Sequence, residues 1–466
     1  MGLIEGYSSS DDDTPEKPTV AELVSRYRQE MDLLQKSQED DPTPETTVDK
    51  PKDKVVTKQT AKRAKKNFDI DYSGPWKKKH KVSGHTEQVG EENSEEVGGI
   101  EDENDGDAED PISSTSTTTE QTPWSQFVGS KQRDYLGRSF LHIPQDLPIK
   151  LTKDPTSHEC FVPKKVITTF AGHKGGVNKI ELFPLSGHLF LSCGNDCQIK
   201  LWDFYHQREL LRVYHGHSLP VKDIAFDNTG EKFLSCGYDK VIRLWETESG
   251  EVLKTVKVNA IPNTLKFHPF NDQEFIVGLS NKNIEHYDLS IPEYTVPIQV
   301  YDHHQGSINS LTIIDDGNRF MLTSDDKTVR FWDWQINIPV KFISDPSQHS
   351  MPLAKVTPDG RFIALQSMDN TIHVIQGYGK YKFNRAKTFS GHITAGYGIA
   401  IDISPDGKII MSGDSKGNAF FWDWKSTKLV RKFKVDNKPT TCICFHPQET
   451  SKVLIGGLSG KIYCCD

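Results

Sequence analysis

Residues 172–203 read GHKGGVNKIELFPLSGHLFLSCGNDCQIKLWD. This stretch begins with Gly172-His173, passes through apolar runs and a turn that contains Asp196, and ends in Trp202-Asp203. Residues 216–246 repeat the same order, from a Gly-His pair to a Trp-Glu pair. The position of Trp202 recurs at intervals of 42 to 47 residues, where it is occupied by Trp245, Tyr287, Trp332, Ile375, Trp422 and Cys465.

A period of this length with Gly-His and Trp-Asp pairs is typical of a WD-repeat β-propeller, in which each repeat supplies one four-stranded blade. The sequence therefore predicts an all-β, seven-bladed propeller over residues 159–466. An ordered lead-in is expected over residues 124–158, where Tyr, Phe, Leu and Ile are frequent. Residues 1–123 are expected to form a long, largely disordered tail.

The last repeat ends at Cys465-Asp466, where the third strand of a blade normally ends. The fourth strand of that blade must come from elsewhere. Residues 166–170, VITTF, lie immediately before the first Gly-His pair. We expect this segment to pair with the last blade, because an unpaired strand edge tends to aggregate or slip.

The expected tail has a composition that does not suit a packed core. Hydrophobic residues make up 35% of the chain, below the roughly 45–50% usual for globular proteins, and nearly all long apolar runs lie after about residue 125. One exception is a possible helix over residues 20–36. Thr19 and Glu22 have the spacing of a capping box, and the apolar residues that follow recur on one helical face.

Charge in the tail is segregated, although the chain as a whole carries a formal charge of −9. Residues 50–81 contain twelve Lys or Arg, and residues 87–110 contain twelve acidic residues and no Lys or Arg. A short basic cluster can act as a nuclear-import signal or contact nucleic acid, and a merely solvating tail is the alternative. The candidate partner or RNA contacts are Lys62, Arg63, Lys65, Lys66, Trp76, Lys77, Lys78 and Lys79 in the tail, and Tyr135 and Arg138 in the lead-in.

Other features exclude several classes of protein. No apolar run approaches the ~18–20 residues that span a bilayer, and the N-terminus is acidic where a signal peptide would be basic. An intracellular protein without a membrane partner is expected. The eight cysteines lack the paired spacing of zinc ligands, so we expect buried thiols, no metal and no cofactor.

Polar residues at fixed blade positions predict buried hydrogen-bond networks. The expected sets are His173, Ser192, Asp196 and Trp202 in blade one, His217, Ser235, Asp239 and Trp245 in blade two, and His304, Thr323, Asp326 and Trp332 in blade four. Blade five keeps His349 and Asp369, and blade six has Lys416 at the Asp position. An active site would occur once, whereas a packing network recurs, so we expect no catalytic residue, no small-molecule substrate and no enzyme.

Several stretches are not part of the general repeat pattern. They are DYLGRSFLHIPQD (134–146), CFVPKK (160–165), FPLSGHL (183–189), QHSMP (348–352), QSMDN (366–370) and HPQETSKV (446–453). Together they resemble the pre-mRNA-processing factor seventeen family, also called the cell-division-cycle protein forty family, over about residues 124–466.

The resemblance implies a nuclear, non-enzymatic spliceosome component that acts at the second transesterification step, when the 3′ splice site is docked and the exons are joined. It also implies a link to cell-cycle progression. The implied partners are proteins and small nuclear RNAs of the catalytically activated spliceosome, with pre-mRNA as a further candidate. A substrate-recognition propeller of a ubiquitin ligase or a chromatin complex is the alternative.

Overall fold

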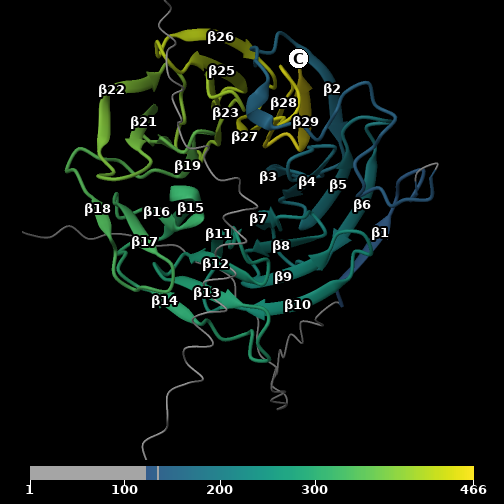
Figure 1. Cartoon of the computed structure of the whole chain (residues 1–466), viewed down its shortest axis with the longest axis horizontal. Coiled ribbons are helices and arrows are strands. Elements are labelled where there is room, and N and C mark those ends of the chain that lie inside the picture. Colours follow the sequence, from purple (N-terminus) through teal and green to yellow (C-terminus); the bar gives the residue numbers. More distant parts are fainter. Residues whose placement is uncertain (1–121, 134–135) are drawn as a thin grey trace, which may run out of the picture. The chain divides into compact units, whose positions relative to one another are not determined.

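A computed structural model describes residues 122–133 and 136–466. In this part of the chain, seven antiparallel sheets are arranged around a central axis as the blades of a propeller (Figure 1). The chain forms one blade after another, and the first strand of each blade lines the axis. The disordered tail was predicted for residues 1–123, and residues 1–121 lie outside the described part of the chain. The tail contacts, the 20–36 helix and Tyr135 therefore also lie outside it.

The strands of the first three blades follow in chain order. Blade one contains β3 (Val177–Leu182), β4 (Leu189–Gly194), β5 (Gln198–Asp203) and β6 (Leu210–His215). Blade two contains β7 (Val221–Phe226), β8 (Lys232–Gly237), β9 (Val241–Glu246) and β10 (Val252–Lys257). Blade three contains β11 (Pro262–Phe267), β12 (Glu274–Leu279), β13 (Ile284–Asp288) and β14 (Gln299–Tyr301).

The next three blades continue in the same order. Blade four contains β15 (Ile308–Ile314), β16 (Arg319–Ser324), β17 (Val329–Asp333) and β18 (Lys341–Ile343), with the 3-10 turn η2 (Asp315–Gly317). Blade five contains β19 (Leu353–Val356), β20 (Phe362–Gln366), β21 (Thr371–Gln376) and β22 (Phe383–Ser390). Blade six contains β23 (Ile401–Ile403), β24 (Ile409–Gly413), β25 (Asn418–Asp423) and β26 (Leu429–Lys434).

Blade seven joins the two ends of the propeller. Its first three strands are β27 (Thr440–Phe445), β28 (Val453–Gly457) and β29 (Lys461–Cys465), and its outer strand is β2 (Val166–Ala171). β2 contains the 166–170 segment expected to close the ring, and it pairs antiparallel with β29. Two strands separated by most of the propeller sequence therefore hold the ring shut.

The recurring Trp position occupies the same place in every blade. Trp202 lies opposite Phe190 across the two middle strands of blade one. The corresponding pairs in the other blades are Phe233 with Trp245, Phe275 with Tyr287, Phe320 with Trp332, Ile363 with Ile375, Ile410 with Trp422 and Val453 with Cys465. The alignment read from the sequence is therefore the strand register of the structure.

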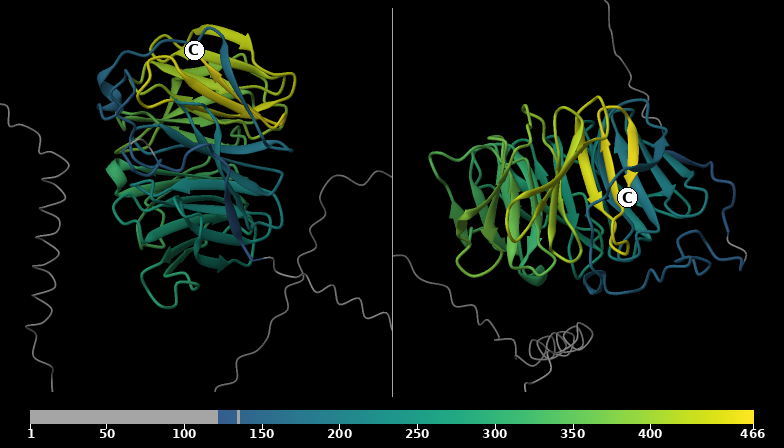
Figure 2. Two further views of the ribbon diagram at one scale, coloured as in Figure 1. Left: turned by 90° about the vertical axis from the view of Figure 1, so that its right-hand side faces the viewer. Right: turned by 90° about the horizontal axis from the view of Figure 1, so that it is seen from above.

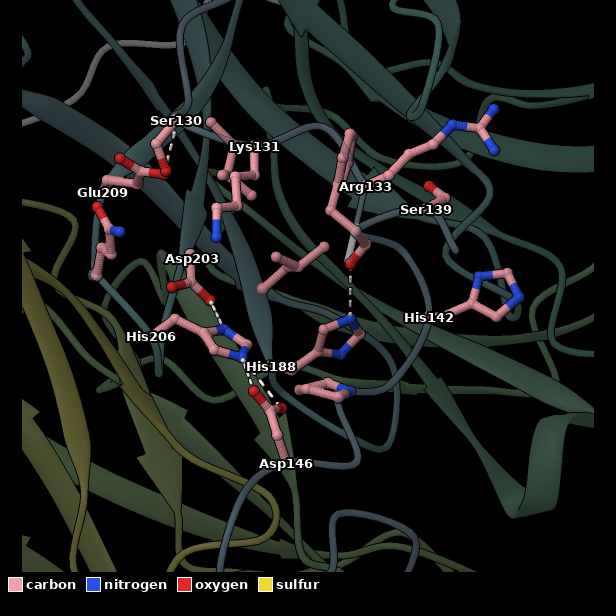
Figure 3. A pocket seen from close by; sticks show the side chains of 15 residues that line it. Ser130, Lys131, Arg133, Ser139, His142, Asp146, His188, Asp203, His206 and Glu209 are labelled. Atoms are coloured by element: carbon pink, nitrogen blue, oxygen red, sulfur yellow. Dashed lines mark hydrogen bonds and ion pairs between the residues drawn. The ribbon is translucent and has the colours of Figure 1, made fainter. Parts of the chain in front are cut away.

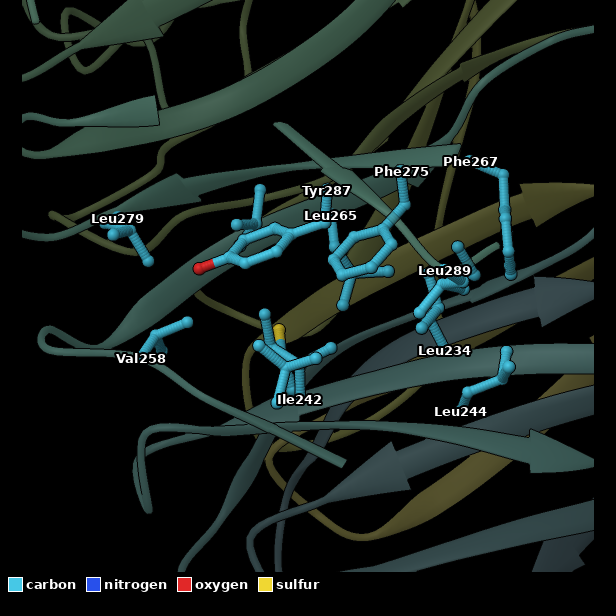
Figure 4. Close-up of a cluster of buried hydrophobic side chains, with 14 residues drawn as sticks. Leu234, Ile242, Leu244, Val258, Leu265, Phe267, Phe275, Leu279, Tyr287 and Leu289 are labelled. Carbon is cyan, nitrogen blue, oxygen red and sulfur yellow. The ribbon is translucent and has the colours of Figure 1, made fainter. Parts of the chain in front are cut away.

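The hydrophobic core is divided among the spaces between neighbouring blades. Figure 4 shows the cluster between blades two and three, where Leu244 and Ile242 of β9 face Phe267 and Leu265 of β11. Phe275 and Tyr287 stack with their ring centroids 5.1 Å apart within the same cluster. Each blade thus buries one of its faces only by packing against the next blade, so the ring is stabilised as a whole.

The lead-in is attached to the propeller at both of its ends. β1 (Trp124–Phe127) pairs with β6 as a fifth, outermost strand of blade one, so part of the lead-in belongs to a blade. The segment between β1 and β2, which contains the 3-10 turn η1 (Pro155–Ser157), lies along one face of the ring (Figure 2). No helix in the described residues has the length and apolar character needed to cross a membrane.

Candidate functional site

The polar residues of blades one and two form closed hydrogen-bond networks. In blade one, His173 Nδ1 is 2.9 Å from Asp196 Oδ1 and His173 Nε2 is 2.8 Å from Ser192 Oγ. Trp202 Nε1 donates to the same Ser192 Oγ at 2.8 Å. Blade two repeats this arrangement with His217, Ser235, Asp239 and Trp245, at distances of 2.8 to 2.9 Å. The sequence-predicted residues are therefore brought together in both blades.

A basic side chain joins each network, which the sequence analysis did not include. Lys200 Nζ lies 3.0 Å from Asp196 Oδ2, and Arg243 Nη1 lies 3.3 Å from Asp239 Oδ2. Lys200 and Arg243 each stand two residues before the blade Trp, and Arg330 occupies that position in blade four. This recurrence is the sequence signal that identifies the position.

The electrostatics of these networks suit a structural role. Burial lowers the pKa of His173 and outweighs the opposing effect of Asp196, so the imidazole is neutral at pH 7. Burial alone would raise the pKa of Asp196, but its hydrogen bonds with His173 and Lys200 hold that pKa below the ordinary value. In blade one a neutral histidine is thereby held between a carboxylate and a serine hydroxyl, and the polar side-chain atoms of this network are all hydrogen-bonded.

Blade four departs from the predicted network. His304 Nδ1 is 2.8 Å from Asp326 Oδ2, as expected. However, the Thr323 hydroxyl, Trp332 Nε1 and His304 Nε2 are buried without a hydrogen-bond partner among the described residues. Threonine is branched at Cβ and has a restricted χ1, and its hydroxyl does not take the bridging place of Ser192 or Ser235. Trp332 is therefore held by packing, including a 5.8 Å stack on Phe320.

This difference predicts unequal effects of removing the indole N–H. Trp202→Phe breaks a buried hydrogen bond and leaves Ser192 with one partner fewer, whereas Trp332→Phe breaks none. We expect Trp202→Phe to cost about 1–2 kcal/mol more in unfolding free energy than Trp332→Phe. Urea denaturation of the two variants measures the difference. Equal costs would show that the indole N–H contributes nothing in blade one.

Blades five and six deviate further from the sequence expectation. His349 is exposed, and Asp369 instead lies 3.1 Å from His373 Nε2, within its own blade. In blade six, Asp414 lies two residues before Lys416 and accepts hydrogen bonds from the backbone N–H groups of Lys416 and Asn418. The turn is therefore stabilised by an aspartate at a shifted position.

The lead-in covers the turns between the first and second strands of three blades. The Gln448 side chain of blade seven donates to the Lys153 carbonyl at 2.7 Å, and Phe161 N donates to the Thr450 carbonyl at 2.7 Å. In blade six, Asp406 accepts from the backbone N–H of Cys160 at 3.0 Å. Phe140 also contacts His188 of blade one, so residues 140–161 are hydrogen-bonded to blades one, seven and six.

A cavity of about 250 Å³ lies between the lead-in and blade one (Figure 3). His206 stands at its edge between Asp203 of the blade and Asp146 of the lead-in, with Nε2 3.2 Å from Asp146 Oδ1. His188 is buried, with Nε2 3.3 Å from the Phe140 carbonyl oxygen, and burial lowers its pKa to about 4. These histidines attach the lead-in to the blade, and the sequence analysis missed both.

The axis of the propeller is lined by charged side chains that largely neutralise one another. Lys179 Nζ is 3.5 Å from Asp223 Oδ1, and Lys355 Nζ is 2.9 Å from Asp402 Oδ1. The same aspartates also link blades, because Asp223 accepts from the backbone N–H of Leu265 at 3.1 Å and Asp402 accepts from that of Phe445 at 2.8 Å. Within the described residues, no group of His, Cys, Asp or Glu has an arrangement suited to a metal ion.

Arg138 is the one predicted partner contact that the structure describes. It lies half-buried in the lead-in, in the turn between Arg133 and Ser139. The tail candidates and Tyr135 are outside the described residues. The structure therefore places the blade networks and the lead-in, and the role of the tail remains a prediction from its sequence.

Comparisons with known proteins agree with this architecture. The WD domain, G-beta repeat family model matches residues 164–203, 208–246, 295–333 and 383–423. Pre-mRNA-processing factor 17 of Saccharomyces cerevisiae is 40% identical over 471 residues, which covers 100% of both chains. Pre-mRNA-processing factor 17 of Homo sapiens is 41% identical over 331 residues, covering 71% of this chain and 57% of the human protein. The chain belongs to the pre-mRNA-processing factor 17 family.

Proposed function

We propose that this protein is a non-enzymatic scaffold of the spliceosome that acts in nuclear pre-mRNA splicing. The observation that carries the proposal is the 40% identity to the yeast pre-mRNA-processing factor 17 along the entire chain, which includes the tail as well as the propeller. A propeller is a rigid support on which partners bind. The blade networks are structural, because the same His-Ser-Asp-Trp set recurs in separate blades.

The proposed stage of action is the second transesterification, when the 3′ splice site is docked and the exons are ligated. The protein would join the catalytically activated spliceosome in the nucleus, with spliceosomal proteins and small nuclear RNAs as its partners. A link to cell-cycle progression would then follow from splicing of particular transcripts. The family resemblance is the support for these finer assignments.

Two parts of the molecule have suitable properties for this role. The propeller buries its recurring polar networks and has its outer strands and turns available to partners. The tail carries the basic block of residues 50–81 next to the acidic block of residues 87–110. A positive segment gains affinity for a phosphate backbone through counterion release and needs no base-specific contact. One chain could in this way connect protein and RNA surfaces that lie far apart.

Reversing the charge of the basic cluster tests the tail. We expect Lys62→Glu, Arg63→Glu, Lys65→Glu and Lys66→Glu together to weaken association with active spliceosomes or to reduce nuclear import, because four positive charges become negative. Co-purification with small nuclear RNAs and imaging of the protein measure the two effects. Normal behaviour in both assays would refute the proposed role of the cluster.

A functional assay addresses the stage of action. Extract depleted of this protein should complete the first step of splicing and accumulate the lariat intermediate and free 5′ exon, and adding the purified protein should restore ligated exons. A block before the first step would contradict the assignment. Recovery of cullin subunits or histones with the protein, in place of small nuclear RNAs, would favour the ubiquitin-ligase or chromatin alternative.

A further inference from the structure

The outer edges of blades five and six are strongly basic. β22 and the loop before it, residues 377–390, contain Lys380, Lys382, Arg385 and Lys387 and no Asp or Glu. β26 and the turn before it, residues 424–435, contain Lys425, Lys428, Arg431, Lys432 and Lys434, also without Asp or Glu. All of these side chains except Lys387 belong to exposed residues. We call this surface the basic rim.

Contacts between blades make the basic rim continuous. Lys387 Nζ of β22 donates to the Trp424 carbonyl at 2.8 Å and lies 4.5 Å from the centroid of the Trp424 ring. On the other side, Arg431 donates to the carbonyl of Lys164, which precedes β2. Lys164 and Lys165 are exposed and extend the positive surface towards blade seven. β22 and β26 lie next to each other on the circumference of the ring (Figure 1).

Most of these charges are not used within the molecule. Five of the lysines form no ion pair with any residue that the structure describes: Lys380, Lys382, Lys425, Lys428 and Lys434. Arg385 pairs with Asp345 at 3.2 Å, but its side chain is 86% exposed. The nearby Asp423 is occupied by the turn, where it accepts from the backbone N–H of Ser426 at 2.6 Å. The basic rim is therefore available to a negatively charged partner.

We propose that the basic rim binds the phosphate backbone of RNA. The inference rests on the proposed function, since an RNA-containing assembly supplies the ligand, and it assigns that ligand to a surface of the propeller. A row of exposed lysines that form no ion pair within the molecule attracts phosphates without reading sequence. Side chains on the same face of a strand recur about every 6.6 Å, so Lys432 and Lys434 can contact successive points along an extended backbone.

An exposed aromatic residue favours RNA over an acidic peptide. Tyr378 lies at the start of the β22 segment, and it is 58% exposed. An exposed aromatic ring beside a positive surface provides a face on which a base can stack. A run of carboxylates has no planar base to stack on this ring, so the ring adds more to the binding of RNA. Residues 87–110 of this same chain form an acidic segment. This segment is the occupant that would compete with RNA for the basic rim.

The test uses the full chain with four unpaired lysines of the basic rim reversed, as Lys382→Glu, Lys425→Glu, Lys428→Glu and Lys434→Glu. The matched control reverses four exposed lysines elsewhere, as Lys174→Glu, Lys282→Glu, Lys327→Glu and Lys461→Glu. Affinity for single-stranded oligouridine, for an RNA duplex and for polyglutamate is measured over a series of salt concentrations. Both variants carry the same net charge. A difference in their RNA affinity therefore depends on where the reversed charges lie on the surface.

We expect the rim variant to lose about tenfold or more in affinity for RNA at low salt, and its salt dependence to become shallower by roughly 3 in log–log slope. The control variant should change much less. The oligouridine and duplex arms show whether single strands or helices are preferred. RNA binding equal to that of the control would overturn the proposal, and so would loss of polyglutamate binding alone, which would indicate an acidic protein segment as the occupant.

The same assay with the tail variant of Lys62, Arg63, Lys65 and Lys66 separates the two proposals. If the rim variant binds RNA normally while the tail variant is impaired, the basic rim is excluded and the spliceosomal role stands. A different outcome is that the rim variant is impaired in RNA binding but the unsubstituted protein does not recover small nuclear RNAs from extract. In that case the basic rim binds RNA and the proposed function fails.

Discussion

Trp202→Ala is expected to lower the free energy of unfolding by about 3–5 kcal/mol. The Trp202 side chain is 3% exposed, and its ring stacks on Phe190 at 6.0 Å and meets the edge of Phe170 at 5.7 Å. Its indole N–H is bound by Ser192. Alanine would therefore leave a large cavity and remove one partner of the network. Denaturant unfolding monitored by circular dichroism measures the loss.

Trp124→Ala is the matched control for this substitution. Trp124 is 51% exposed and stacks on His215 at 4.1 Å on the outer edge of blade one. Its loss should cost about 1 kcal/mol or less, because little buried area is removed. Similar costs for the two tryptophans would contradict the structural role assigned to the recurring Trp position.

Deletion of residues 160–170 is expected to have the second large effect, a fall of roughly 5–10 °C or more in Tm. The deletion removes all of β2 except Ala171, exposes the edge of β29 and takes away Phe170, which is 3% exposed. Loss of a buried phenylalanine alone costs about 3–5 kcal/mol. Differential scanning calorimetry measures the change, and an unchanged melting curve would show that β2 does not close the ring.

Deletion of residues 122–130 provides the comparison. This removes β1, which also adds an outer strand to a blade, but blade one keeps its own four strands. The fall in Tm should therefore be distinctly smaller than after removal of β2. A larger effect from losing β1 would mean that the lead-in, and not the closing strand, holds the ring together.

The spacing of one repeat position was sufficient to predict the register of the fold. Trp202, Ile375 and Cys465 have little chemistry in common, yet each occupies the same place opposite the preceding strand. The prediction succeeded because every blade must fill the same space between the same strands. Spacing is set by strand and turn lengths, so it persists where the residue itself has changed.

Other features depend on geometry that the sequence does not reveal. Thr323 occupies the position of Ser192, but its hydroxyl does not bridge His304 and Trp332. His349 follows the repeat pattern in position, yet Gln348 is buried and His349 is exposed. These differences depend on rotamer and on local packing, which a residue pattern does not specify.

The basic rim was missed for a different reason. Its two halves are residues 377–390 and residues 424–435. The first three strands of blade six, β23 to β25, lie between them in the sequence. Neither half is as dense in Lys and Arg as the tail cluster at Lys62 to Lys66. They form one surface only because the outer strands of consecutive blades become neighbours on the circumference. A surface of this kind can be recognised once the ring is built.

The pairing of β2 with β29 also sets a delay during synthesis. Ala171 of β2 lies opposite Lys461 of β29, and about 290 residues separate the two along the chain. At roughly 5–20 residues per second, a ribosome needs about 15–60 s to make that stretch. For that time β2 has no partner, and contacts of such long sequence separation form slowly. Until then the chain carries an unpaired strand edge, which is open to wrong pairing, so we expect ring closure to be the folding step most open to failure.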